Sequence, residues 1–400
     1  MKKYLTYDDV NIVPKYSELK SREDVKLNTR FTKNTELTIP IVASPMDTVT
    51  ELDMAKEMLD WGGVGVIHRF QSIEKQVRMM MSLHYEWDRY FTPLSGNDNE
   101  EGLSIDKEWD EWWNHVRGWN HPPTKSDWED LKDRFYWADS LIKSEEQWKK
   151  LPRCAAVGVK GDYLERGKEL VNNGCNVLLI DVAHGHHILV KKVIEEFKNE
   201  FGTDVEIIGG SIATKKATHD LCEWGVDGIR VGVGNGSLCE TRIRTGVGLP
   251  QVTALLDVCS IADDYDVPVI ADGGVRNVGD VCKGLGCGAD TVMVGSLLSG
   301  TKESPGTIEK IGEWPNEKLF KKYRGSASRD SKGNDKNVEG NHKIIPYKGK
   351  IKRILLDIRD GVHSSFSYVG ANNMSEYHFK VEFVEVTKAG QIEAKPHLLN

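Results

Sequence analysis

The chain has 400 residues, 53 of them basic and 61 acidic, and its formal net charge is −8. This charge argues against nucleic-acid binding, which requires a basic surface to meet the phosphate backbone. No apolar run reaches the roughly 18 residues of a membrane span, and the polar start of the chain does not resemble a signal peptide. Seven scattered cysteines without a CxxC pair disfavour disulfides and structural zinc, so we expect a protein of the reducing cytoplasm.

Eight apolar, β-branched segments alternate with amphipathic helical stretches. Continuous apolar runs of this kind are typical of parallel strands that are buried on both faces. Eight strand–helix units predict an α/β fold, a closed (β/α)8 TIM barrel, with active-site groups in the loops after the strand C-termini. The predicted strands are Ile39–Ser44, Val64–His68, Cys154–Val159, Val177–Val182, Val205–Ile208, Gly228–Val233, Val267–Ala271 and Thr291–Val294.

The chemically interesting polar residues follow these predicted strands rather than being scattered along the chain. Because the C-terminal ends of all barrel strands meet at one rim, this placement predicts a shared pocket. In chain order the residues are Asp47, His68, Arg69, Asp181, His184, Cys239, Asp272, Gly295 and Ser296.

The loop Gly234–Thr241 is the most distinctive of these segments. It sets Cys239 in a glycine-rich turn directly after an apolar strand. Glycines permit positive φ angles and a close approach of the backbone to a ligand, and Ser237 with the loop amides is suited to hold a phosphate oxygen. A lone cysteine is more often buried packing. The gathering of polar residues at the other strand ends favours a nucleophile instead.

Residues 85–151 differ from the segments on either side. They hold eight of the eleven tryptophans, among acidic residues and Asn, Gly and Pro breakers. The spacing of Trp109, Trp112 and Trp113 predicts a helix with an aromatic stripe. We interpret this insert as a small helical subdomain that packs its own tryptophans, with a partner or oligomer surface as the alternative. The predicted divisions are a first barrel part at 1–84, the Trp-rich helical insert at 85–151 between strands two and three, and a second barrel part at 152–400 with a flap at about 323–349 and a C-terminal tail.

Several motifs occur together in the chain. They are Tyr7–Val10, Ser44–Thr50, Gly62–Arg69, Asp181–His186, Gly234–Thr241, Ala271–Arg276 and Val294–Gly300. No single motif is specific, but the combination is. Over nearly its whole length outside the insert, the chain resembles the inosine monophosphate dehydrogenase and guanosine monophosphate reductase family.

The resemblance implies covalent chemistry at Cys239. Purine C2 is flanked by two ring nitrogens and is electrophilic once the ring is polarised, so a cysteine thiolate can add to it. The resemblance also implies that backbone carbonyls of Gly234, Gly236 and Cys239 ligate a monovalent cation, potassium. Relatives of this kind assemble as tetramers, so a homotetramer is expected.

The same resemblance assigns the nucleotide and cofactor sites. Asp272 would accept hydrogen bonds from both ribose hydroxyls; the alternative is that it caps the following helix. The implied substrate-binding residues are Ser237, Asp272, Gly273, Gly274, Gly295, Ser296, Tyr323, Gly325 and Ser326, several of them around the 5′-phosphate. Arg69, Asp181, Val182 and Ala183 are the implied contacts of the nicotinamide cofactor.

Two histidines in the same region, His184 and His186, resemble metal ligands in isolation. The sequence places no carboxylate or cysteine at metal spacing beside them, so we interpret them as loop hydrogen-bonders.

The family contains two reactions, and the flap discriminates between them. The dehydrogenase oxidises inosine monophosphate (IMP) with NAD and hydrolyses the cysteine adduct with a flap that bears an Arg-Tyr pair. The reductase releases ammonia from guanosine monophosphate (GMP) or its deoxy form and uses NADPH to yield IMP. Only nine residues separate Ser328 from Val338, and this stretch lacks an Arg-Tyr pair. We therefore expect a GMP reductase, with Thr241 and Glu339 as the proton relay to the departing amine.

Other features keep two alternatives open. The run His184–His186 and the tail Glu393–His397 resemble the dehydrogenase, and Arg329 is a candidate base for it. An inactive barrel that binds purine nucleotides is the second alternative. The joint presence of Cys239 and Glu339 argues against that reading, because an unused reactive thiol is prone to oxidation.

Overall fold

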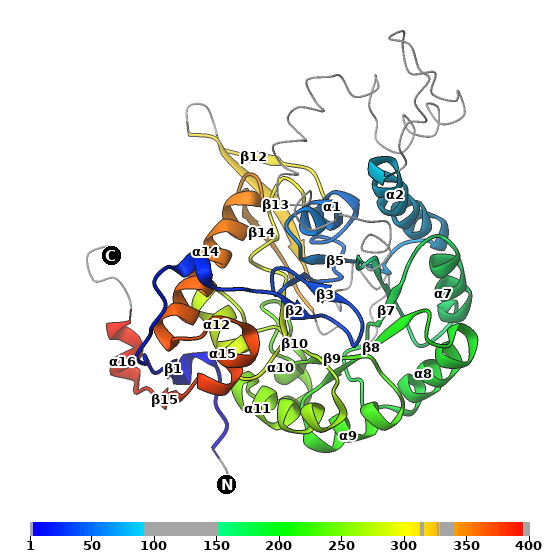
Figure 1. The fold of residues 1–400 in the computed structure, drawn as a ribbon. Helices are drawn as coiled ribbons and strands as arrows, with labels where there is room; N and C mark the ends of the chain where they lie inside the picture. Colours follow the sequence, from blue (N-terminus) through cyan, green and yellow to red (C-terminus); the bar gives the residue numbers. More distant parts are fainter. Residues whose placement is uncertain (1–2, 92–150, 313–315, 326–327, 329–339, 395–400) are drawn as a thin grey trace.

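The computed structural model describes residues 3–91, 151–312, 316–325, 328 and 340–394. Within this part of the chain, eight parallel strands close into a barrel that is surrounded by helices (Figure 1). The predicted (β/α)8 TIM barrel is therefore confirmed. Its strands are β4 (Ile41–Ala43), β5 (Val64–Ile67), β6 (Cys154–Val157), β7 (Val177–Ile180), β8 (Glu206–Ile212), β9 (Gly228–Val231), β10 (Val269–Asp272) and β11 (Thr291–Val294).

The continuous apolar strands have buried residues on both faces. In β4, Val42 belongs to a cluster of apolar residues inside the barrel, whereas Ile41 and Ala43 belong to the larger cluster between the barrel and the helices. Because successive side chains of a strand point to opposite faces, a strand that is covered on both faces must be apolar throughout. This requirement explains why the strands were readable in the sequence.

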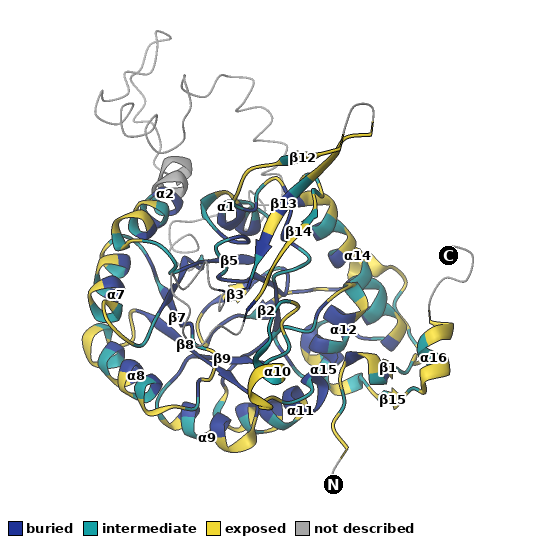
Figure 2. Cartoon of the chain, turned by 180° about the vertical axis from the view of Figure 1, so that it is seen from behind, coloured by how far each residue is buried: buried dark blue, intermediate teal, exposed yellow. Residues whose placement is uncertain are grey.

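The outer helices each bury one face against the barrel and expose the other (Figure 2). A short helix, α10 (Thr241–Thr245), also lies between β9 and the helix that follows it. The outer helices are α1 (Leu52–Asp60), α2 (Ile73–Phe91), α7 (Tyr163–Asn172), α8 (Ile188–Phe201), α9 (Lys215–Glu223), α11 (Gln251–Ala262), α12 (Val278–Gly286) and α14 (Lys352–Val369).

The N-terminal end of the barrel is closed by a hairpin of β2 (Thr29–Arg30) and β3 (Glu36–Leu37). Glu206, the first residue of β8, accepts hydrogen bonds from the hydroxyls of Thr32 and Thr35, each at 2.6 Å. Phe31 from the same hairpin is fully buried in the interior cluster. The site for a ligand is therefore at the opposite, C-terminal rim.

An antiparallel sheet rises from the barrel after β11. It consists of β12 (Glu309–Ile311), β13 (Lys318–Arg324) and β14 (His342–Pro346), with Tyr323 opposite Lys343 in the register. The strands β13 and β14 are the two arms of the predicted flap. Residues 326–327 and 329–339 between them lie outside the described part of the chain.

Segments near the two ends of the described chain, β1 (Val10–Ile12) and β15 (Phe383–Glu385), lie side by side (Figure 1). The two strands pair in an antiparallel arrangement. The remaining elements are η1 (Tyr7–Asp9), η2 (Arg22–Asp24), η3 (Asp263–Tyr265), α15 (Met374–Lys380) and α16 (Lys388–Glu393).

The sequence predictions for the fold differ from the structure mainly at boundaries. The fifth predicted strand, Val205–Ile208, continues to Ile212. Helix α2 runs on to Phe91, past the start of the predicted insert, and residues 92–150 are outside the described part. The Trp-rich helical insert therefore stays a prediction. In the described part of the chain, no helix is both long enough and apolar enough to cross a membrane.

Candidate active site

Cys239 lies in a tight turn after β9, two residues before α10 begins. Its N–H donates to the carbonyl of Gly236 at 3.0 Å, which closes the turn. Gly234 has a φ of +74°, and a Cβ at that position would lie 2.7 Å from Cγ of Arg242, so both backbone conformation and space require glycine. The Cys239 thiol donates to the hydroxyl of Thr241, with 3.1 Å between Sγ and Oγ1. The structure thus brings the predicted nucleophile and the predicted relay hydroxyl into contact.

The other six cysteines are poor candidates for the nucleophile. All seven are free thiols, and Cys239 alone among them is not buried. Burial raises the pKa of Cys175 to about 12, and the pKa values of Cys222 and Cys282 to about 11. Since the thiolate is the nucleophilic form, these side chains stay protonated and unreactive at neutral pH. Burial also raises the pKa values of Cys154, Cys259 and Cys287.

The chain that returns from the flap contacts the cysteine loop. Gly340 forms an isolated antiparallel bridge with Cys239. The N–H of Asn341 donates to the carbonyl of Leu238 at 3.1 Å, and the N–H of Gly325 donates to the carbonyl of Asn341 at 2.9 Å. Both arms of the flap therefore meet beside the thiol.

Two predicted site residues belong to the flap but are outside the described part of the chain. Ser326 follows Gly325 in the sequence, and Glu339 immediately precedes Gly340. Their roles stay predictions.

Ser237, Tyr323 and Gly295 meet on the other side of the cysteine loop. The hydroxyls of Ser237 and Tyr323 are 3.1 Å apart. A Cβ at Gly295 would lie 3.3 Å from the Tyr323 hydroxyl and 3.4 Å from Oγ of Ser44, so a side chain here would crowd these groups. Burial raises the pKa of Tyr323. The negative charge of Asp272 adds to this rise, and the hydrogen bond to Ser237 partly opposes it. The neutral Tyr323 hydroxyl thus remains a hydrogen-bond donor for an anion.

The loop after β10 contacts the loop after β11, which carries Gly295. The hydroxyl of Ser296 donates to the carbonyl of Val275 at 3.3 Å, which ties the loop after β11 to the loop after β10. Gly273 and Gly274 have φ angles of +89° and +81°, which other residues rarely adopt. The two loops follow β10 and β11, which are the seventh and eighth barrel strands. TIM barrels frequently bind phosphate at the loops after these two strands.

Asp272 is the last residue of β10 and does not cap the following helix. The N-cap of α12 is Asn277, whose side chain accepts from the N–H of Asp280 at 3.0 Å. Burial raises the pKa of the Asp272 carboxyl, with Arg230 opposing the rise and Asp181 adding to it. Its side chain keeps 25% of its surface exposed and is therefore accessible to a ligand.

Two side chains that the sequence analysis did not single out hold the main chain of Asp272 in place. Asn235 Nδ2 donates to the main-chain carbonyl of Asp272 at 3.0 Å, and Gln251 Nε2 donates to the same oxygen at 3.2 Å. Asn235 also donates to Oε1 of Gln251 at 2.5 Å. Gln251 is fully buried at the start of α11. Its signal in the sequence was a polar glutamine at the start of an apolar segment.

Arg69 and Asp181 meet at the rim, as expected of neighbours in one site. Nε of Arg69 lies 3.4 Å from Oδ2 of Asp181. The guanidinium of Arg69 also lies over the ring of Phe70, 4.9 Å from its centroid. Of the adjoining residues, Val182 is half-buried and Ala183 is exposed. This part of the rim is open to a ligand that carries both polar and flat groups.

Arg230 is a further site residue that the sequence analysis missed. It is buried in β9, and its guanidinium lies 3.1 Å from Asp181 and 3.9 Å from Asp272. A charged residue inside the apolar segment Gly228–Val233 was the signal that could have found it, because buried charges are rare unless paired.

Of the two histidines in the loop after β7, His186 forms a hydrogen bond, as predicted for both. His186 Nε2 lies 2.8 Å from Oδ2 of Asp220, and Lys216 contacts the same carboxylate. These partners lower the pKa of Asp220 to about 2. No group of three or more His, Cys, Asp or Glu side chains suited to a metal ion occurs in the described part of the chain.

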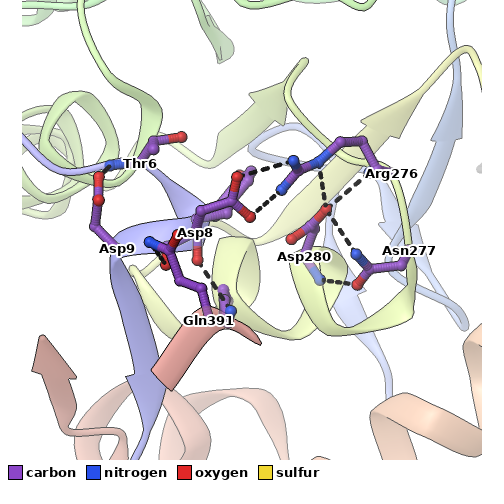
Figure 3. Close-up of polar contacts among 9 residues, drawn as sticks. Thr6, Asp8, Asp9, Arg276, Asn277, Asp280 and Gln391 are labelled. Carbon is purple, nitrogen blue, oxygen red and sulfur yellow. Dashed lines mark hydrogen bonds and ion pairs between the residues drawn. The ribbon is translucent and has the colours of Figure 1, made fainter. Parts of the chain in front are cut away.

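Residues near both chain ends hold the loop after β10 from outside (Figure 3). Arg276 forms two contacts with the carboxylate of Asp8, and its N–H donates to Asp280 at 2.9 Å. Gln391 Nε2 donates to the carbonyl of Asp8 at 2.9 Å. The segments at the two ends therefore stabilise the loop that follows Asp272.

The chain matches the family described as IMP dehydrogenase / GMP reductase domain over residues 4–397. It belongs to this family. The resemblance that the motifs indicated is thereby confirmed. The chain is an oxidoreductase of purine nucleotide metabolism, in a family whose members bind a purine nucleotide and use NAD(P).

Relatives within the family carry both activities in their names. The chain is 35% identical to the inosine-5′-monophosphate dehydrogenase of Nitrosopumilus maritimus, over 99% of this chain and 98% of the relative. It is 36% identical to the corresponding enzyme of Cryptosporidium parvum, over 99% and 95%. It is 32% identical to the GMP reductase of Leishmania major, over 98% and 96%.

A similar solved structure comes from the family as well. It is a Cys-to-Ala variant of GMP reductase from Trypanosoma brucei in complex with guanosine 5′-monophosphate, with a TM-score of 0.81 and 32% identity. The match covers 99% of this chain and 98% of the other. Family membership and fold are thus shown, and both reactions occur among the relatives.

Proposed function

We propose that the chain is a GMP reductase, which converts GMP or its deoxy form to IMP and ammonia with NADPH. The observation that carries the proposal is the bridge between Cys239 and Gly340, because Gly340 is the residue that follows Glu339 in the sequence. The flap sequence supplies a carboxylic acid at this point and no Arg-Tyr pair.

Cys239 is the proposed nucleophile. Its sulfur adds to purine C2, and the C2–N bond to the exocyclic amine then breaks. Thr241 accepts the hydrogen bond of the thiol at 3.1 Å, so its hydroxyl is in position to pass a proton between the reacting centre and an acid. Because an unprotonated amine is a poor leaving group, this proton transfer lowers the barrier.

Glu339 is the proposed source of that proton. It is covalently joined to Gly340, which pairs with Cys239. A carboxylic acid suffices for the release of ammonia, whereas hydrolysis of the adduct to xanthosine monophosphate requires a base that activates water. The chemistry available from the flap sequence therefore favours the reductase.

The nucleotide is held on either side of the thiol in this proposal. The Asp272 carboxylate accepts the two ribose hydroxyls, and Ser237 and Tyr323 donate to the 5′-phosphate. The flanking glycines allow the backbone to approach, and their amides complete the phosphate site. These glycines and the remaining phosphate ligand are Gly273, Gly274, Gly295, Gly325 and Ser296.

The rim residues fit a nicotinamide cofactor. The Arg69 guanidinium lies over the Phe70 ring, Asp181 offers a carboxylate, and Ala183 is exposed, which suits a flat ring that bears an amide and a ribose. NADPH, when bound, would supply the hydride to purine C2, and the bond between C2 and the Cys239 sulfur would then break to release IMP and regenerate the thiol. The side chains Arg69 and Asp181 and the backbone of Val182 and Ala183 would hold it.

The cysteine loop also fits a monovalent cation. Potassium prefers neutral oxygen ligands, and the backbone carbonyls from Gly234 to Cys239 lie close together in the sequence. The tight turn that Cys239 N–H closes onto Gly236 would keep the carbonyls of Gly234, Gly236 and Cys239 close together. A bound cation would thereby fix the loop that carries the thiol.

IMP dehydrogenase is the second candidate function. The relatives from Nitrosopumilus and Cryptosporidium, which favour it, are 35% and 36% identical, slightly above the 32% of the Leishmania reductase. In that case Arg329 would be the base to test first.

A paired product assay tests the assignment. The enzyme is incubated with GMP and NADPH, and separately with IMP and NAD⁺, each with potassium. Loss of NADPH absorbance at 340 nm, release of ammonia and formation of IMP in the first reaction support the reductase. Xanthosine monophosphate from the second reaction, with no ammonia from the first, would reverse the assignment. No turnover with either pair would indicate an inactive nucleotide-binding barrel.

A further inference from the structure

Arg230 is a buried arginine between the two proposed binding positions. It lies on β9 and only 4% of it is exposed. Its Nη2 atom is 3.1 Å from Oδ1 of Asp181, and its Nη1 atom is 3.9 Å from Oδ2 of Asp272. One guanidinium therefore faces both the carboxylate proposed for the cofactor and the carboxylate proposed for the ribose.

The two carboxylates are paired unequally. Asp181 has a second cation, Arg69, with 3.4 Å between Nε and Oδ2. In the described part of the chain, the ion pair found for Asp272 is the longer one to Arg230. The four groups alternate in sign from Arg69 to Asp272, so the cluster is neutral when all are ionised. Because a buried charge is unfavourable without a partner, Arg230 serves both carboxylates rather than one.

The Arg230 guanidinium has few hydrogen bonds besides its contacts with the two carboxylates. Its Nη2 atom makes one further contact, at 3.4 Å with the carbonyl of Val182. Its Nε atom is buried and has no hydrogen-bond partner among the described residues. The position of Arg230 is therefore set by the balance between Asp181 and Asp272.

We propose that Arg230 couples the two sites, so that a nucleotide ribose at Asp272 increases the affinity for the nicotinamide cofactor at Asp181. This inference rests on the binding roles in the proposed function but not on the direction of the reaction. Ribose hydroxyls donate to Asp272 and compensate its charge, which lets Arg230 pair fully with Asp181. The Asp181 carboxylate is then fixed for the cofactor. Coupling between two ligands is reciprocal, so the cofactor strengthens nucleotide binding by the same factor.

The coupling is measured with pairs that cannot react. IMP with NADPH and IMP with NADH lack an oxidant, and GMP is avoided because release of its amine needs no hydride. Isothermal titration calorimetry gives the Kd of IMP in the absence of cofactor and at saturating cofactor. The experiment uses wild-type protein, Arg230→Lys and the control Arg166→Lys. Arg166 is also a buried arginine, but its partners are Asp162 and Gln76, away from the two carboxylates.

In wild-type protein we expect the cofactor to lower the nucleotide Kd by about tenfold, within the usual range of allosteric coupling. A lysine carries one compact charge and cannot bridge two carboxylates as a planar fork does, so Arg230→Lys should reduce the effect to about twofold or less. Arg166→Lys should keep the wild-type effect. Absence of coupling in wild-type protein, or unchanged coupling in Arg230→Lys, would overturn the proposal.

A second variant serves if Arg230→Lys fails to fold. In Asp181→Asn, Arg230 pairs fully with Asp272, and the ribose must displace it without an alternative carboxylate. Nucleotide affinity in the absence of cofactor should then fall about threefold or more, although Asp181 does not contact the nucleotide in the proposal. Unchanged affinity would contradict it. Failure of the GMP reductase assay together with normal coupling would refute the direction of the reaction and not this role of Arg230.

Discussion

Gly340 pairs with Cys239 through a single antiparallel bridge, so the chain that returns from the flap passes the thiol at main-chain distance. The barrel supplies the nucleophile and its hydroxyl partner Thr241, whereas the flap supplies the neighbouring residues on the other side. A change of flap sequence can thus change the chemistry while the barrel keeps the same thiol. Two reactions in one family are a reasonable consequence of this arrangement.

Substitution of the nucleophile should separate binding from chemistry. Cys239→Ala removes the only thiol of the seven that is not buried, so turnover should be lost, by about 10⁴-fold or more for a covalent mechanism. Nucleotide Kd should change by less than about threefold, because Asp272 and the phosphate loops are intact. Steady-state kinetics and calorimetry check both expectations, with Cys222→Ala as a matched control that keeps activity. Substantial turnover by Cys239→Ala would exclude the mechanism.

The thiols should differ in reactivity in the same way. At neutral pH, limited iodoacetamide should alkylate Cys239 first, because burial raises the pKa values of Cys175, Cys222 and Cys282 and keeps them protonated. Peptide mass spectrometry reads out the modified site. Saturating GMP should protect Cys239. Faster labelling of a buried cysteine would contradict the structure.

Asp272→Asn should weaken nucleotide binding by about 10- to 100-fold, the scale expected for loss of charge-assisted hydrogen bonds from two hydroxyls. In wild-type protein the affinity should fall as the pH falls through the pKa of Asp272, because the protonated carboxyl loses acceptor capacity. Since burial raises this pKa, the fall should begin at a higher pH than for an ordinary aspartate. The variant should lack this pH dependence.

A nucleotide without 2′- and 3′-hydroxyls is the control for Asp272. Wild-type protein and Asp272→Asn should bind it with equal affinity. A raised carboxyl pKa also means that the ionised form destabilises the folded protein above that pKa. Thermal unfolding of the free variant at pH 7 should therefore occur at a higher temperature than for wild-type protein. A lower unfolding temperature would show that the carboxylate stabilises the fold.

Glu206→Gln should lower the free energy of unfolding by about 2 kcal/mol, because the amide nitrogen cannot accept the hydroxyl or N–H hydrogen bonds that the carboxylate receives. Glu206 accepts from Thr32, Thr35 and Asn34 and holds the hairpin that closes the N-terminal end of the barrel. Thermal unfolding measures the loss, and kcat per folded protein should be unchanged because the site is at the other rim. Reduced kcat with normal stability would contradict this separation.

The sequence predicted the barrel because its strands are apolar on both faces. Val42 and Ile41 must both be buried, so the strand is visible as a continuous apolar run. The positions of Cys239, Asp272 and Asp181 after or at strand ends were predictable because each follows such a run and belongs to a recognisable motif, and their roles stay predictions. Their contacts were not predictable. The bridge from Cys239 to Gly340 joins residues about 100 positions apart, and no local pattern encodes it.

The supporting residues were the hardest to predict. Arg230 sits inside a strand where its neighbours are apolar, and only the three-dimensional fold places Asp181 and Asp272 around it. Asn235 and Gln251 act through the main-chain carbonyl of Asp272, a group that carries no sequence signal. A polar residue inside an apolar segment indicates a buried group that needs a hydrogen-bond or ion-pair partner elsewhere in the fold.

Glu339→Gln tests the direction of the reaction. Release of ammonia needs an acid that protonates the departing amine through Thr241, and the glutamine side chain cannot supply that proton. Turnover of GMP with NADPH should fall by about 10²-fold or more, the usual scale for loss of a general acid, with little change in nucleotide Kd. Arg329→Lys is the matched flap variant and should keep most activity. Unchanged turnover of GMP with NADPH in Glu339→Gln would refute the proton relay. If the wild-type protein instead oxidised IMP with NAD⁺ and Arg329→Lys abolished that reaction, the flap would supply a water-activating base and the chain would be an IMP dehydrogenase.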